Sequence, residues 1–180
     1  ISIMSELRTN RIVPRDGLPS GSSGGIIQVV HANTSAHTHS NSTSYTDITG
    51  VTATITPTRS DSKILIQCSL AIGKEDNHSM LGRIVRNGSA ISGSGGVAES
   101  GHGNQEDGVW WVVRTSNHSA NPLMVNYLDS PTSTSALTYK AQGKTTNSSY
   151  PFAINRSVSS NDLEYASPAF SMITLMEVSA

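Results

Sequence analysis

The alternation of apolar and polar residues in "SKILIQCSLAI" constrains the fold of this chain more than any other feature. Every second residue from Ile64 to Ile72 is apolar, and the polar residues Lys63, Gln67 and Ser69 occupy positions of the other alternate set. Successive side chains of an extended strand point to opposite faces. The stretch is therefore predicted to be a strand with one face buried in a core.

Similar β-type patterns recur along the chain between turns rich in Gly, Asn, Ser and Pro. "GVTATITPT" repeats the alternation with Val51, Ala53 and Ile55 on the inner side. Strands are expected within residues 25–30, 42–48, 50–58, 62–72, 81–91, 109–115, 123–129, 135–142, 150–156 and 170–178. No convincing helical pattern occurs. About ten short strands at this spacing predict an all-β fold, an antiparallel jelly-roll sandwich.

Turn residues predict how some of these strands are connected. Asn87-Gly88 lies between apolar flanks, and Asn-Gly accepts the positive φ values of a type I′ hairpin turn. The polar stretch "PTRSDS", residues 57–62, has a common hairpin length and is expected to join two neighbouring strands. The Gly-rich stretch 92–108 has no periodicity and is expected to form a long loop at one end of the fold.

The first 24 residues differ in composition from the rest of the chain. They hold two prolines and a Gly/Ser cluster with few apolar residues, so they cannot form a core of their own. We expect 1–24 to be an extended arm and hinge, with Met4 as the natural start, and 25–180 to be one head domain. A tail without a binding role is the alternative. The arm residues expected to contact a partner are Leu7, Ile12, Val13, Arg15 and Leu18.

The chain ends in "SPAFSMITLMEVSA", an apolar stretch that reaches almost to the last residue. Terminal segments are usually poorly ordered unless a strand or helix holds them. A strand that is covered on both faces has a nearly continuous apolar sequence. The last strand is therefore predicted to lie inside the fold.

Charge and cysteine content exclude several functions. Charged residues make up 14% of the chain and the formal net charge is −1, so no electrostatic field favours binding to nucleic acid or to an anionic membrane. No stretch approaches the roughly 18 apolar residues needed to span a bilayer. Neither a nucleic-acid partner nor membrane insertion is expected. The single cysteine, Cys68, is predicted to be a small core residue.

Four segments carry a resemblance to a known group of proteins. They are "SELRTNRIVPRDGLPSGSSGGIIQVV", "TDITGVTATITPTRSDSKILIQCSLAIG", "NYLDSPTSTSALTYKAQ" and "SMITLMEVSA". In these segments the chain resembles the small β-rich virion proteins of marine tailed bacteriophages, especially cyanophage tail-fibre-like proteins. The order of the later strands is also similar to that of the trimeric jelly-roll heads of complement and tumour-necrosis-factor-like proteins.

The resemblance implies a non-enzymatic, homotrimeric virion protein on the exterior of the tail or capsid. It implies a tail fibre or receptor-binding tip whose arm binds another virion protein and whose loops contact a host-surface glycan or protein. The last strand is then expected in an inner sheet near the threefold axis, with Ile173 and Leu175 on one side. The subunit contacts are expected at Met172, Thr174, Met176 and Val178. A capsid decoration or head-fibre protein, a carbohydrate-binding module and a glycan hydrolase remain alternatives.

Candidate ligand-binding residues lie in the polar loops and beside the Trp pair: His102, Glu106, Asp107, Trp111 and His118. A Glu99–Glu106 carboxylate pair would suit glycan cleavage, whereas a solvated turn is the simpler interpretation. One Trp of the pair should face inward and the other outward. No catalytic residue and no cofactor are expected, because neither a cysteine–histidine nucleophile context nor a phosphate-binding Gly-rich motif with Lys-Ser/Thr occurs.

One spacing suggests a metal site. His37 and His39 are two residues apart in "HANTSAHTHS", so they project to one face if the segment is extended. Imidazole suits iron, zinc or nickel, and trimeric phage fibres of the kind that the chain resembles can hold a metal between such pairs. Exposed loop histidines in a Ser/Thr/Asn-rich stretch are the alternative.

Overall fold

The computed structural model describes residues 25–74, 79–91, 110–112, 120–158 and 169–179, with side chains described in all of these except 110–112. Within these ranges the chain forms eleven strands and no helix. The strands are β1 (Ile26–Thr34), β2 (Thr38–Ser40), β3 (Thr46–Ile55), β4 (Lys63–Lys74), β5 (Met80–Arg86), β6 (Ser89–Ala90), β7 (Trp110–Val112), β8 (Asn121–Asp129), β9 (Leu137–Thr145), β10 (Phe152–Ile154) and β11 (Ser171–Val178). The expected arm at 1–24 and the expected loop at 92–108 lie outside the described residues.

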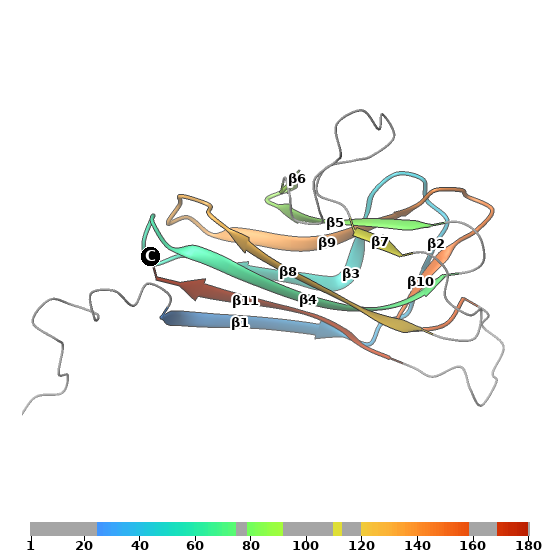
Figure 1. Ribbon diagram of the computed structural model, residues 1–180, viewed down its shortest axis with the longest axis horizontal. Coiled ribbons are helices and arrows are strands. Elements are labelled where there is room, and N and C mark those ends of the chain that lie inside the picture. The colour runs from blue at the N-terminus through green and yellow to red at the C-terminus, as the bar shows by residue number, and fades with distance from the viewer. Residues whose placement is uncertain (1–24, 75–78, 92–109, 113–119, 159–168, 180) are drawn as a thin grey trace, which may run out of the picture.

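The strands form two antiparallel sheets that face each other (Figure 1). The six-stranded sheet has the order β1-β11-β4-β10-β2, with β8 paired to β4 as well. The five-stranded sheet has the order β3-β9-β5-β6, with β7 also paired to β5. The predicted all-β, antiparallel jelly-roll sandwich is confirmed. In the described part of the chain no helix is long and apolar enough to cross a membrane.

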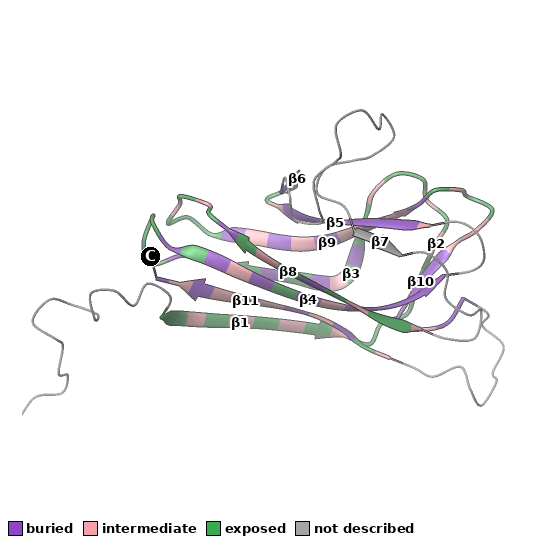
Figure 2. Ribbon diagram, viewed as in Figure 1, coloured by how far each residue is buried: buried purple, intermediate pink, exposed green. Residues whose placement is uncertain are grey.

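The core lies between the sheets and follows the alternation of the sequence. Ile64, Ile66 and Cys68 of β4 are at most 2% exposed, and Ile173 and Leu175 of β11 are 0% exposed. Buried residues alternate with half-buried or exposed ones along β11 and along β4 as far as Leu70 (Figure 2). The terminal strand is thus an internal member of its sheet, between β1 and β4, as the sequence predicts.

The prediction that residues 57–62 form a hairpin between neighbouring strands is wrong. β3 and β4, the strands on either side of these residues, lie in different sheets. Both strands have one apolar face, and that face is buried equally well when the strands face each other across the core as when they pair edge to edge. The alternation therefore predicted the strands correctly but carried no information about which sheet each one joins.

The second expected hairpin is confirmed. Asn87 and Gly88 have φ angles of 50° and 85°, as a type I′ turn requires. The turn closes the β5–β6 pair, in which Val85 faces Ala90 and Arg86 faces Ser89.

The expected strands at 42–48 and 50–58 form a single strand, β3, with a break in its register between Asp47 and Thr52. Gly50 lies in this break with a φ of 78°. A Cβ atom on Gly50 would lie 2.5 Å from Cβ of Thr34 in β1. The bulge thus needs glycine both for its backbone angle and for the close approach of β1.

Three buried polar residues connect segments that are distant in the sequence. Asp129 of β8 accepts a hydrogen bond from Tyr139 Oη at 2.7 Å and pairs with Arg86, which links the two sheets. Burial, and next the hydrogen bond to Asp129, raise the pKa of Tyr139, so its phenol stays a neutral donor at physiological pH.

Glu177 is 0% exposed and sits on the inner side of β11. Its carboxylate accepts hydrogen bonds from Gln28 Nε2 at 2.7 Å and from the backbone N and Oγ1 of Thr58 at 2.7 and 2.8 Å. Burial raises the pKa of Glu177, but these hydrogen bonds outweigh it and lower the pKa to about 2. Glu177 therefore fastens both β1 and the β3–β4 connection to the last strand.

Asn155 is 0% exposed and has a φ of 63°. Its Nδ2 donates to the carbonyl oxygens of Thr34 and Ala36 at 3.0 and 2.9 Å. Its Oδ1 accepts from Ser171 Oγ at 2.7 Å. One side chain thereby joins the end of β1 to the start of β11.

Candidate functional site

The outer side of the six-stranded sheet is the most unusual surface of the described chain. We call it the exposed sheet face and define it by the outward side chains of β1, β11, β4 and β8. Its members are Val29, His31, Asn33, Met172, Thr174, Met176, Val178, Lys63, Leu65, Gln67, Ser69, Met124, Asn126 and Leu128.

Strand register arranges these side chains in rows across the four strands. One row is apolar throughout and consists of Val29, Met176, Leu65 and Leu128. The next row is polar and consists of His31, Thr174, Gln67 and Asn126. A third row alternates and consists of Asn33, Met172, Ser69 and Met124. Side chains that are neighbours in a row touch across strands, so the apolar row forms a continuous band.

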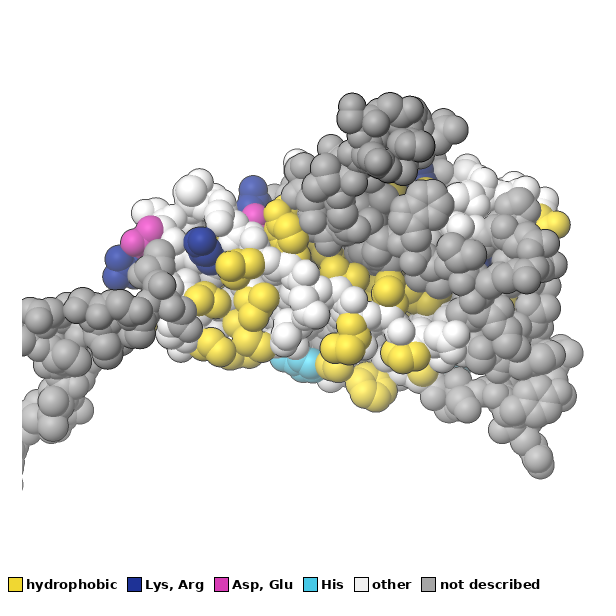
Figure 3. All heavy atoms as spheres, viewed as in Figure 1, with side chains coloured by type: hydrophobic (Ala, Val, Ile, Leu, Met, Phe, Trp, Pro, Cys, Tyr) yellow, Lys and Arg dark blue, Asp and Glu magenta, His cyan; other side chains and the backbone are white. Residues whose placement is uncertain are grey.

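Large apolar side chains are exposed on this sheet and its margins. Val29, Met124 and Leu128 are 56%, 69% and 46% exposed. The other exposed large apolar residues of the described chain are Ile26 and Ile27 in β1 and Phe170 just before β11. Figure 3 shows hydrophobic side chains gathered over β1, β11, β4 and β8. Contiguous apolar surface of this sort marks an interaction site in soluble proteins.

Charge is nearly absent from the exposed sheet face. Lys63, at one end of β4, is its single Lys, Arg, Asp or Glu residue. Depletion of charged residues is the compositional signature of the centre of a protein–protein interface. The arrangement is suited to covering by another protein surface.

His31 is the titratable group in the middle of this face. Its Nδ1 lies 2.9 Å from Thr174 Oγ1, and its Nε2 lies 3.4 Å from Asn33 Nδ2. Because an amide nitrogen can only donate, Nε2 is the acceptor there and Nδ1 carries the proton that is donated to Thr174. The imidazole is thus held in the polar row by its own sheet.

The structure brings the four predicted contact residues of β11 together on this face. Met172, Thr174, Met176 and Val178 are all half-buried and point away from the core. Sequence reasoning missed Val29, Leu65, Met124 and Leu128, which complete the face. A signal for them exists, because "GIIQVV", "KILIQ" and "LMVNYLD" have apolar residues at both alternating positions.

The other predicted sites fall partly outside the described residues. Trp111 lies in β7 opposite Leu81, but its side chain is not described. The candidate residues that lie outside the described ranges are Leu7, Ile12, Val13, Arg15, Leu18, Glu99, His102, Glu106, Asp107 and His118.

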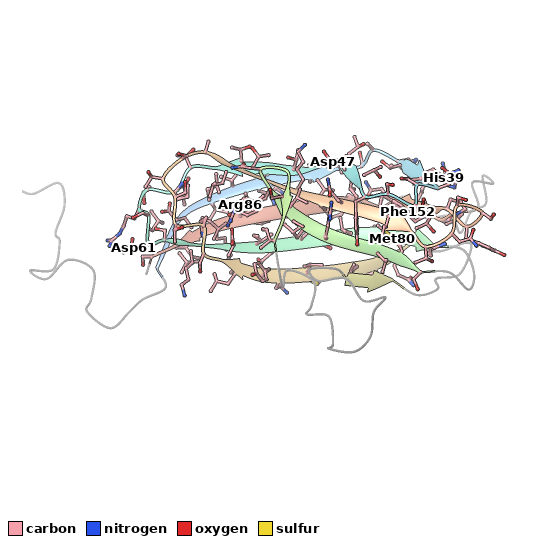
Figure 4. All side chains as sticks on the ribbon, turned by 90° about the horizontal axis from the view of Figure 1, so that it is seen from above. His39, Asp47, Asp61, Met80, Arg86 and Phe152 are labelled. Atoms are coloured by element: carbon pink, nitrogen blue, oxygen red, sulfur yellow. The ribbon has the colours of Figure 1, made fainter. Side chains whose placement is uncertain are left out.

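The two candidate metal ligands are described. His37 is exposed in the connection after β1, and His39 is exposed in β2 opposite Ala153. Figure 4 places His39 at the opposite end of the sandwich from Asp61. Among the residues whose side chains are placed, no group of three or more His, Cys, Asp or Glu residues could hold a metal ion. A site at His37 and His39 would need ligands from elsewhere.

No protein-family model matches the chain, and a search of curated proteins finds no match.

Proposed function

We propose that this chain is a non-enzymatic structural protein of a tailed-bacteriophage virion and that three copies assemble through the exposed sheet face. The observation that carries the proposal is the charge-poor face with its continuous apolar row of Val29, Met176, Leu65 and Leu128. Obligate subunit interfaces are apolar in the same way, like a domain core cut in half. The virion assignment is supported by the sequence resemblance to phage tail-fibre-like proteins.

A threefold ring agrees with the distribution of apolar side chains at the edges. In such a ring the contact is heterologous, and each subunit meets two neighbours through different surfaces. β1 and β8 are the two outer strands on either side of β11 and β4. Both carry exposed apolar side chains, Val29 on β1 and Met124 and Leu128 on β8.

In the virion, this head would form a tail-fibre or receptor-binding tip on the exterior. The N-terminal arm would bind another virion protein, and the surfaces that stay free in the trimer would meet the host. Cryo-electron microscopy of virions that carry the chain tests the position. Density for the head at the tail tip supports the proposal, and density distributed over the capsid lattice would instead make it a decoration protein.

Sedimentation equilibrium of the full chain tests the assembly. We expect three times the chain mass of 19.0 kDa. Met176→Asp should yield a folded monomer, because a buried unpaired charge costs several kcal/mol, roughly 3–5, whereas the half-exposed site accepts a charge in the free subunit. Thr52→Asp, on the exposed side of β3 in the other sheet, is the matched control and should remain trimeric. A monomeric wild type, or a trimeric Met176→Asp variant, would refute the interface.

A further inference from the structure

His31 is the residue of the exposed sheet face that can change its charge near neutral pH, since histidine ordinarily titrates between pH 5 and 8. It is exposed in β1, which is an outer strand of its sheet. Val29, two residues away on the same side of the strand, is 56% exposed and belongs to the apolar row. The imidazole therefore lies where a subunit packed on this face would cover it.

The hydrogen bonds of His31 are those of an uncharged imidazole. Nδ1 donates to Thr174 Oγ1 at 2.9 Å, and Nε2 accepts from Asn33 Nδ2 at 3.4 Å. A proton added to Nε2 turns this acceptor into a donor, so Asn33 would have to turn its amide and present Oδ1 instead. In the free subunit this adjustment and the surrounding water accommodate the positive charge.

The exposed sheet face holds no acidic side chain that could pair with a charged His31. Its one charged member is Lys63, at the end of β4. The residues that share the polar row with the imidazole are Thr174, Gln67 and Asn126. A hydroxyl and two amides can donate and accept hydrogen bonds, but they cannot neutralise a cation.

The acidic residues of the two strands packed against β1, which are β11 and β3, point elsewhere. Glu177 of β11 faces inward, and its pKa is about 2. Asp47 of β3 pairs with Lys140 on the outer side of the other sheet. The hydrogen bonds from Gln142 and then from Lys140 lower the pKa of Asp47. Both carboxylates therefore stay ionised in mild acid and neither faces His31.

We propose that His31 is a pH switch for assembly through the exposed sheet face: the copies associate while this imidazole is neutral and separate when it is protonated. This inference rests on the proposed function, since only a covered face makes the proton costly. Both meeting surfaces of the proposed ring belong to the same charge-poor face, so a neighbouring copy excludes water from the imidazole without supplying a counter-charge. Leaving a charge buried and unpaired in this way is strongly destabilising.

Protonation favours the free subunit, because the imidazole stays solvated there. Dissociation of one trimer can therefore take up as many as three protons, one for each copy of His31. By linkage, association is strongest at pH values where histidine is ordinarily neutral, and it weakens as the pH falls through the range in which histidine ordinarily titrates. The trimer is thus expected in mild alkali and free, folded subunits in mild acid.

Sedimentation velocity of the full chain over a dilution series, at pH 8 and at pH 5.5, measures the concentration at which half of the subunits are assembled. We expect this midpoint to be about tenfold or more higher at pH 5.5. His31→Gln keeps a polar side chain that cannot be protonated, so the ratio of its two midpoints should be about one. His31→Lys carries a charge at both pH values and should be monomeric at both. Circular dichroism of the wild type should show the same β signal at the two pH values.

His37→Gln and His39→Gln are the matched controls, because both histidines are exposed but lie outside the exposed sheet face. Each should keep the midpoint ratio of the wild type. The switch is overturned by a His31→Gln variant that keeps this ratio or fails to assemble at pH 8, by a control that loses the ratio, by a trimeric His31→Lys variant, or by unfolding at pH 5.5. A wild type with equal midpoints at both pH values refutes the switch alone, whereas a monomeric wild type at pH 8 refutes the proposed assembly as well.

Discussion

At the scale of single residues, Glu177 couples stability to pH. Its pKa is about 2 in the folded chain, against an ordinary value of 4.5 for a glutamate side chain. A carboxyl whose pKa is depressed by folding contributes its stability above the unfolded pKa and loses it as the pH falls through the folded value. The window of loss therefore runs from about pH 4.5 down to about pH 2.

Glu177→Gln should lower the free energy of unfolding by about 1.5–3 kcal/mol at pH 7, because hydrogen bonds to a charged acceptor are lost. The difference from wild type should shrink as the pH falls through that window. Urea unfolding at pH 7, 4 and 3, at equal protein concentration, measures both effects. A pH-independent difference would show that the ionised carboxylate is not the stabilising group.

Two variants of Asn155 separate the contributions of its backbone angle and its side chain to stability. Asn155→Ala removes the hydrogen bonds to Thr34 and Ala36 and places an alanine at a φ of 63°. Asn155→Gly removes the same hydrogen bonds but tolerates the angle. Both variants should be destabilised, and the alanine variant by about 1 kcal/mol more. Equal thermal midpoints for the two variants would mean that the backbone angle contributes nothing.

The burial of a residue could be predicted from the sequence where it follows from the alternation of apolar and polar residues along a strand. Cys68 is buried as expected, and burial raises the pKa of its thiol to about 12, so it is a packing residue in the folded chain. His31 and Thr174 were not predictable as a pair. They lie in segments far apart in the sequence, and only sheet register brings them together.

At the scale of elements, the sequence predicts strands better than it predicts their partners. The alternation in β4 and β11 and the Asn87-Gly88 turn are local signals, because one segment suffices to define each. The pairing of β11 with β1 and β4 joins segments that are far apart in the sequence and depends on all three. The error at residues 57–62 has this origin, since a turn of suitable length fits a hairpin and a crossing between sheets equally well.

Gly50 and Gly88 offer a matched test of a bulge against a turn. Both have positive φ, 78° and 85°, but a Cβ on Gly88 would meet nothing within 4 Å. Gly88→Ala should therefore cost only the backbone penalty of about 1 kcal/mol. Gly50→Ala should cost about 1–3 kcal/mol more, because the new methyl group collides with Thr34 of β1. Chemical unfolding that ranks the two equally would contradict the close approach of β1 and β3.

At the scale of the whole molecule, the two outer surfaces of the sandwich differ in kind. One is apolar and nearly free of charge, and the other carries charged side chains such as the pair of Asp47 and Lys140. The sequence predicted the outward residues of β11, but their extension into a four-strand face needed the register of β1, β4 and β8. The charge contrast is invisible in the net charge of −1 because it appears only after folding.

A trimer that assembles through the apolar surface has a stability that depends on protein concentration. The thermal midpoint of the wild type should rise measurably over a hundredfold increase in concentration, whereas that of Met176→Asp should stay constant. Scanning fluorimetry across a dilution series measures this. Parallel behaviour of the two proteins would contradict dissociation coupled to unfolding.

The lone thiol in β4 has a practical consequence. Cys68 lies in the core between the two sheets and is 2% exposed, so a thiol-reactive dye reaches the sulfur only when this core opens. Because the chain has one cysteine, each labelled molecule records one opening event. The rate of dye uptake under native conditions would thus measure how often this core opens.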